Sequence, residues 1–281
     1  MIIDSHTHYM EPLRPDRPHQ AESIMHPFSV HELAAAADAV GVDRVVQVTG
    51  SAMGEDNRFS IEGAIERPDK VLGVVGRFDP IAPDVKARLA EYFAPAQILS
   101  LRLTLFLASS EHWLRENSLE AFLRAAAELS VPVCIHAPFQ NAEMLATARR
   151  HGGVRFIVDH MNVRHEKNAT AQSAFRQWKE LIELAREPNV WIKVSYLPEA
   201  AMGSETYPFP TARQRMRELY DSVGAARLIW GSNYPVVRRA CNYAQALDFI
   251  RKECDFLGAA DRDAILGGNF LRDFAKEQAG R

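Results

Sequence analysis

Few features of the sequence tie it to a membrane, a nucleic acid or an oxidising compartment. Three cysteines in 281 residues are too few for a disulfide framework, which favours a reducing compartment. No apolar run approaches the roughly 20 residues that a membrane span needs, and the N-terminus lacks the pattern of a signal peptide. A net charge of -3 gives no general attraction to nucleic acid. We therefore expect a cytoplasmic protein without nucleic-acid or membrane partners, and homo-oligomerisation is left open.

The chain also lacks a glycine-rich phosphate loop after its first apolar run, which disfavours an open, doubly wound sheet. Short apolar runs alternate with longer amphipathic stretches throughout the chain. The expected strands begin near Ile2, Arg44, Val71, Ile98, Val131, Arg155, Val190 and Arg227. Each interval leaves room for a crossover helix. This alternation predicts an α/β fold, a (β/α)8 TIM barrel, with residues 1–281 forming a single domain and residues 261–276 a C-terminal helical appendix.

Local signals place some helix starts and loops. Ser29 with Glu32, and Thr211 with Gln214, fit capping boxes at the beginning of a helix. Segments 11–28, 106–117 and 197–210 are rich in proline, arginine and aromatic residues, and we expect them to be long loops. On a barrel such loops cover the end where the active site lies.

Histidines close three of the expected strands. His6 and His8 end the first strand, and residues two apart on a strand point the same way. His136 ends the fifth strand and His160 the sixth. A lone histidine after an apolar run is more often a hydrogen-bonded core residue. Four at equivalent strand ends favour metal binding or catalysis, because burying imidazoles together costs desolvation that packing alone does not offset.

These motifs, with Trp-Gly-Ser-Asn-Tyr-Pro over 230–235 and Ala-Ile-Leu-Gly-Gly-Asn-Phe over 264–270, resemble the amidohydrolase superfamily. The resemblance is to the branch of lactonases and decarboxylases, which includes pyrone-dicarboxylate hydrolases, sugar-acid lactonases and aminocarboxymuconate-type decarboxylases. It covers nearly the whole chain and implies a hydrolase at the carboxyl end of a barrel.

One position departs from that resemblance. The family normally has aspartate where this chain has Asn233, as a general base or a metal ligand. Asparagine keeps the shape but carries no charge and cannot take a proton from water at neutral pH. Three readings stay open: Asn233 replaces a native aspartate, a histidine serves as the base, or the site binds without turnover. Because the four histidines are retained, we favour an enzyme.

Two mechanisms are compatible with the histidines. Zn²⁺ held by His6, His8 and His136 would leave a position for a nucleophilic water, with His160 orienting the water or polarising the carbonyl. Alternatively, as in metal-free lactonases of the family, the imidazoles would donate hydrogen bonds to the ester carbonyl. The sequence leaves open whether one divalent metal is bound.

Polar and aromatic residues near the expected mouth of the barrel indicate a small anionic substrate. Arginine binds carboxylates through two parallel hydrogen bonds, and Arg102 on the fourth strand needs a partner inside the molecule. The candidate substrate-binding residues are Arg102, Thr104, Arg164, Ser195, Tyr196 and Tyr234.

The first hypothesis is therefore a hydrolase that opens a lactone of a carboxylate-bearing metabolite in a degradation pathway, with His6, His8, His136, His160 and position 233 doing the chemistry. The alternatives are a metal-dependent decarboxylase or hydratase of an unsaturated acid, and a small-acid binding protein in which Asn233 disables catalysis.

Overall fold

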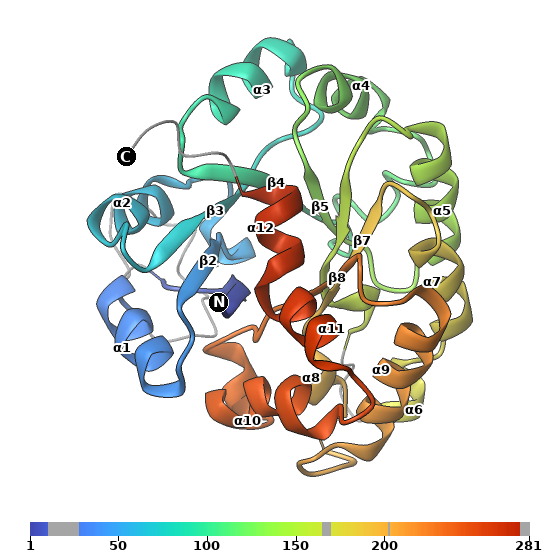
Figure 1. The fold of residues 1–281 in the computed structure, drawn as a ribbon. Helices are drawn as coiled ribbons and strands as arrows, with labels where there is room; N and C mark the ends of the chain where they lie inside the picture. Colours follow the sequence, from blue (N-terminus) through green and yellow to red (C-terminus); the bar gives the residue numbers. More distant parts are fainter. Residues whose placement is uncertain (11–27, 165–169, 202, 276–281) are drawn as a thin grey trace.

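Eight parallel strands form the centre of the molecule. The computed structural model describes residues 1–10, 28–164, 170–201 and 203–275. The strands are β1 (Ile3–Thr7), β2 (Arg44–Val48), β3 (Val71–Arg77), β4 (Ile98–Thr104), β5 (Val133–His136), β6 (Phe156–Val158), β7 (Val190–Val194) and β8 (Leu228–Trp230). Each strand pairs with the next in sequence order. The predicted (β/α)8 barrel is confirmed (Figure 1).

The barrel closes where the chain beyond β8 meets β1. The amide of His8 donates to the carbonyl of Tyr234, and the amide of Asn233 donates to the carbonyl of His6, both at 2.8 Å. Gly231 permits this approach, because a Cβ there would lie 2.6 Å from the Cβ of His6. The closure therefore fixes Asn233 beside the histidines of β1.

Helices surround the barrel and connect successive strands (Figure 1). They are α1 (Val30–Val40), α2 (Arg58–Glu66), α3 (Val85–Phe93), α4 (Glu120–Glu128), α5 (Asn141–Arg150), α6 (Ala171–Ala174), α7 (Trp178–Ala185), α8 (Leu197–Ala201), α9 (Pro210–Val223), α10 (Tyr243–Asp248), α11 (Ala259–Asp263) and α12 (Asn269–Phe274). Short 3-10 or π segments are η2 (Ser51–Met53), η3 (Asp159–Asn162), η4 (Val236–Arg239), η5 (Phe249–Glu253) and η6 (Ala264–Gly268). Within the described ranges, no helix combines the length and apolar character needed to cross a bilayer.

Two clusters of buried apolar residues join the strands of the barrel to the helices around it. The larger lies between the strands and the helices that cover them. The smaller includes the strand residues Val46, Val75 and Ile157, together with Phe270 and Phe274 of α12. The predicted C-terminal appendix is therefore helical, and α12 lies across one end of the barrel (Figure 1). We therefore expect a functional site at the opposite end of the barrel, where the carboxyl ends of the strands lie.

Several local predictions need correction. Ser29 and Glu32 form the predicted capping box of α1. The box at Thr211 is wrong, because α9 begins one residue earlier, at Pro210. The loop predicted over 197–210 is interrupted by α8, whose residues are all buried. Most of the predicted loop 11–28 lies outside the described residues.

Candidate active site

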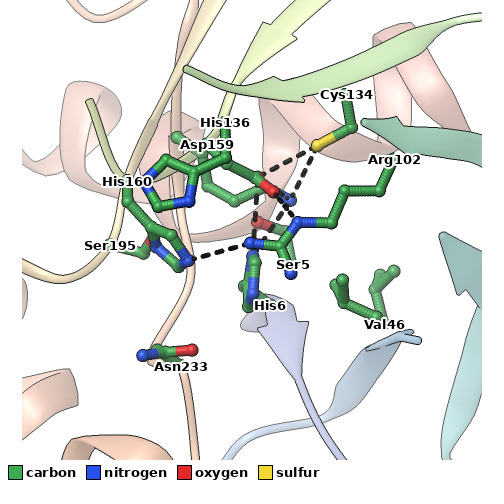
Figure 2. Close-up of polar contacts among 12 residues, drawn as sticks. Ser5, His6, Val46, Arg102, Cys134, His136, Asp159, His160, Ser195 and Asn233 are labelled. Carbon is green, nitrogen blue, oxygen red and sulfur yellow. Dashed lines mark hydrogen bonds and ion pairs between the residues drawn. The ribbon is translucent and has the colours of Figure 1, made fainter. Parts of the chain in front are cut away.

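Four imidazole rings meet at the carboxyl end of the barrel. The ring of His6 lies 5.0 Å from that of His8 and 4.4 Å from that of His160, between centroids. The ring of His136 lies 4.9 Å from that of His160. All four side chains are nearly inaccessible to solvent. The structure thus brings together the four histidines that the sequence singled out. His6, His136 and His160 are labelled in Figure 2.

The turn after β6 delivers His160 to this cluster. His160, Met161 and Asn162 have φ of 54°, 54° and 52°, a left-handed conformation that costs energy for residues with a side chain. Asn162 holds the turn: its Oδ1 accepts from the amide of Ala137, and its Nδ2 donates to Asn141 Oδ1, both at 2.9 Å. Backbone strain is therefore maintained at a residue of the cluster.

Burial keeps the imidazoles neutral at pH 7. Burial, together with the charge of nearby Arg102, lowers the pKa of His8 to about 4 and that of His136 to about 3. The pKa values of His6 and His160 also lie well below the ordinary range, chiefly through burial. Each ring therefore presents one N–H donor and one nitrogen lone pair.

Hydrogen bonds identify which nitrogen carries the proton. His8 Nδ1 lies 2.7 Å from the carbonyl of Val48, which can only accept, so the Nε2 of neutral His8 has the lone pair. The Nδ1 of His6 lies 3.4 Å from the Nζ of Lys193, which can only donate, and 3.5 Å from Oδ1 of Asp159, which can only accept. The Nε2 of His6 is buried and has no hydrogen-bond partner among the described residues, and it carries the proton in the tautomer whose Nδ1 accepts from Lys193.

A second group of charges lies next to the rings, and two of its three members, Asp159 and Lys193, were not predicted as functional. Asp159 forms an ion pair with Lys193, at 2.9 Å from Oδ1 to Nζ. It forms another with Arg102, at 2.8 Å from Oδ2 to Nε (Figure 2). Burial alone would raise the pKa of Asp159, but Lys193, His6 and Arg102 together hold it well below its usual range. Asp159 also raises the pKa of Lys193 against the opposing effect of burial. Two cations against one anion leave this region positively charged.

The signals for Asp159 and Lys193 were present in the sequence. Each is an ionisable residue within or directly after an apolar strand. Cys134, expected to be a small core residue, lies in the same group, with its Sγ 3.0 Å from Asp159 Oδ1, and burial raises its pKa. The predicted internal partner of Arg102 is Asp159.

Arg77 at the end of β3 is a further cation that the prediction missed. It is in register with Arg102 on the neighbouring strand. Its guanidinium donates to Thr104 Oγ1 at 3.1 Å, while Nε is buried without a hydrogen-bond partner among the described residues. Burial lowers its pKa to about 10, and Arg102 contributes to the shift. Arg77 therefore adds to the positive charge and retains a free donor.

The other predicted substrate-binding residues divide into two groups. Ser195 lies against the cluster, with its Oγ 2.7 Å from His160 Nδ1, and the ring of Tyr196 lies 5.1 Å from that of His160. The guanidinium of Arg164 lies 4.3 Å from the centre of the Phe106 ring, which in turn packs on His136. Arg164 and Phe106 line a cavity of about 400 Å³, a size typical of small-molecule sites.

Tyr234 belongs to a different environment. Its ring stacks on Tyr243 of α10, with centroids 4.4 Å apart, and packs against Phe28 at 5.6 Å. It is half-buried in this aromatic group and helps to close the barrel through its backbone.

Asn233 connects the cluster to a buried carboxyl group. Its Oδ1 lies 3.2 Å from His8 Nε2, and its Nδ2 donates to Glu199 Oε1 at 2.8 Å. Glu199 lies on α8, and burial raises its pKa to about 7. The sequence offered no signal for this residue, because α8 was expected to be a loop.

The residues fit a divalent metal poorly. Of the described residues, His6, Asp159 and His160 bring potential ligand atoms within 4.8 Å of one another, and the predicted set of His6, His8 and His136 does not. However, the carboxylate of Asp159 already pairs with two cations, Lys193 and Arg102. A dication there would face two like charges at short range and share their counter-ion. We therefore derive no step through a metal.

Known proteins give independent information on the chain. A family model described as amidohydrolase matches residues 3–272. The chain is 30% identical to an L-fucono-1,5-lactonase of Burkholderia ambifaria, covering 95% of this chain and 93% of that protein. It is 27% identical to a 4-sulfomuconolactone hydrolase of Hydrogenophaga intermedia, over 70% and 62% of the two chains. A solved amidohydrolase from Burkholderia multivorans with bound zinc superposes with a TM-score of 0.82 at 23% identity, over 98% of this chain and 99% of that one.

Proposed function

The chain belongs to the amidohydrolase family, and from that premise we propose that it hydrolyses a lactone of a small hydroxylated acid. Two curated relatives are a lactonase and a lactone hydrolase by name. The positive charge around Arg102 and Lys193 favours an anionic substrate. The proposal concerns a cyclic carboxylic ester rather than an amide, since a lactone is activated enough for neutral imidazoles to suffice.

One observation carries the proposal: two neutral imidazoles 5.0 Å apart offer complementary groups. The Nε2 of His6 has no hydrogen-bond partner among the described residues and is an N–H donor in the tautomer whose Nδ1 accepts from Lys193, and the Nε2 of His8 has a lone pair. In the reaction, the oxygen of water bonds to the lactone carbonyl carbon while one of its protons passes to His8 Nε2. The carbonyl electron pair moves onto oxygen, which accepts a hydrogen bond from His6 Nε2. The ring C–O bond then breaks, and His8 returns the proton to the departing alkoxide, giving a hydroxy acid.

A lactone panel tests this function. Sugar-acid lactones and carboxylate-bearing lactones are compared with open-chain esters and amides, and acid release is followed continuously. We expect turnover of a lactone and none of the matching amide. Release of carbon dioxide from an unsaturated acid, with no lactone opened, would instead support the decarboxylase alternative. Binding without turnover of any of these compounds would support the binding protein.

Chelation tests the part played by metal. We expect the lactonase rate of protein treated with dipicolinate to stay within about twofold of the untreated rate, because Lys193 and Arg102 already compensate the charge of Asp159. Metal content is measured on the same samples. A loss of more than about tenfold that Zn²⁺ restores would contradict this expectation and assign the histidines to a metal.

Arg77 is expected to bind the substrate carboxylate, because the guanidinium of Arg102 is committed to Asp159. We predict that Arg77→Met raises KM for a carboxylate-bearing lactone about tenfold or more, with a smaller effect on kcat. Arg77→Lys keeps the charge, so its KM should lie between that of Arg77→Met and that of the original protein. An unchanged KM in Arg77→Met would place the carboxylate elsewhere, with Arg164 the next candidate.

A further inference from the structure

Glu199 has no role in the proposed reaction, yet it is a buried carboxyl group separated from the proposed base by the amide of Asn233 alone. Its Oε1 accepts from Asn233 Nδ2 at 2.8 Å, and its Oε2 is buried without a hydrogen-bond partner among the described residues. The other end of the Asn233 amide, Oδ1, faces His8 Nε2 at 3.2 Å. The three side chains therefore form a continuous row, His8–Asn233–Glu199.

The row lacks one proton when His8 is neutral. His8 Nδ1–H is committed to the carbonyl of Val48, so Nε2 and Asn233 Oδ1 are then two acceptors facing each other. When His8 has taken a proton from water, Nε2–H donates to Oδ1, and Nδ2 donates to an ionised Glu199. The observed orientation of the amide thus matches the hydrogen bonds needed after proton transfer.

We propose that Glu199 is a positioning residue for the base, which orients the amide of Asn233 and supplies, through it, the negative charge that stabilises protonated His8. Asn233 alone has no charge with which to do so. This inference rests on the proposed function in assuming that His8 takes the proton. It explains how a chain with asparagine at this position can retain a working histidine base.

Protonation of Glu199 should reverse the arrangement. A neutral carboxyl can donate to Asn233 Oδ1, which turns the amide so that Nδ2 donates to His8 Nε2 and occupies the lone pair of the base. Burial raises the pKa of Glu199 to about 7, opposed by the hydrogen bond from Asn233 and by the charge of Arg239. The other ionisable neighbour is Cys241. Packed against α8, helix α6 has no ionisable residue, and the buried residues of α9 are Ala212, Met216 and Leu219.

Because the active form of the row needs an ionised Glu199, we expect activity to be lost on acidification. Activity should fall as pH decreases through about 7, roughly tenfold for each further pH unit. In Glu199→Gln the amide cannot be turned by protonation of residue 199, so activity should stay within about threefold between pH 6 and pH 8. Its kcat at about pH 8 should be at least tenfold below that of the original protein, because the charge is missing. KM should change little.

Exchanging the two side chains provides the matched control. In Asn233→Asp/Glu199→Gln, the carboxylate contacts His8 directly and the amide lies behind it, so kcat at about pH 8 should return to within about threefold of the original. Asn233→Asp alone places two carboxyls 2.8 Å apart, where they share a proton, and should shift the fall in activity above pH 7. A merely structural Glu199 would give neither the flat profile nor the recovery by exchange.

A measurement without substrate separates this inference from the proposed function. In protein labelled with ¹³C at the glutamate carboxyls, one carboxyl should titrate near pH 7, and its signal should be absent from Glu199→Gln. Titration of Glu199 near its ordinary pKa overturns the predicted reversal of the amide near pH 7, even if lactones are hydrolysed. A Glu199→Gln protein with the original rate and pH profile overturns the inference itself. Failure of every lactone with this carboxyl titrating near pH 7 would overturn the proposed function and leave the row of hydrogen bonds in place.

Discussion

Replacing Asp159 by asparagine is expected to lower the free energy of unfolding by about 3–5 kcal/mol. Asp159 is the shared counter-ion of Lys193 and Arg102, all three buried, so the variant keeps two cations and loses the anion between them. The isosteric amide leaves packing unchanged, which assigns the effect to charge. Urea denaturation followed by tryptophan fluorescence and circular dichroism measures it.

Two further variants make that result interpretable. Asp159→Asn/Lys193→Met removes one of the stranded cations and should recover part of the loss. Asp69→Asn removes an exposed carboxylate from an ion pair with Arg67 and should leave the unfolding midpoint unchanged. If Asp159→Asn were as stable as the original protein, the buried charges would be compensated by groups other than those described here.

The second large effect is expected on catalysis. Replacing His8 by glutamine removes the lone pair that takes the proton of water, and kcat should fall by about 10²–10⁴-fold. Substrate binding should be much less affected, since His8 is assigned to proton transfer rather than to the carboxylate. Steady-state kinetics on the best lactone, with binding of the hydroxy-acid product measured separately, distinguish the two.

The control for His8→Gln is the same substitution at an exposed histidine. His31 on α1 pairs with Glu66 at the surface, and His31→Gln should keep the original kcat. If His8→Gln retained more than about a tenth of the activity, another residue would have to be the base, and Glu199 would lose its proposed role with it.

Much of this fold could be predicted because a parallel strand that is buried on both faces appears in the sequence as a short, continuous apolar run. The predicted strand starts at Arg44, Val71, Ile98 and Val190 coincide with observed ones. The other four differ by one or two residues. Strand ends were equally informative, since parallel strands of one barrel bring their carboxyl ends together whatever their separation in sequence.

The remaining part of the site depends on pairing in three dimensions. Lys193 and Asp159 each violate the apolar pattern of a strand, but nothing in the sequence says that they neutralise each other. Glu199 could not be predicted as a site residue for a different reason. Helix α8 spans only Leu197–Ala201 and is too short to show a helical period in the sequence. Its partner, Asn233, was recognised as unusual, while the carboxyl group behind it required coordinates.

The position of α12 has a consequence for how substrate would enter the barrel and product would leave it. Phe270 and Phe274 pack against the strands at the amino end of the barrel, so in the proposed reaction substrate and product would both pass through the carboxyl end. The hydroxy acid would then have to leave before the next lactone binds, and we expect accumulated product to inhibit competitively. Loops at the plugged end are correspondingly free to vary in length without disturbing this exchange.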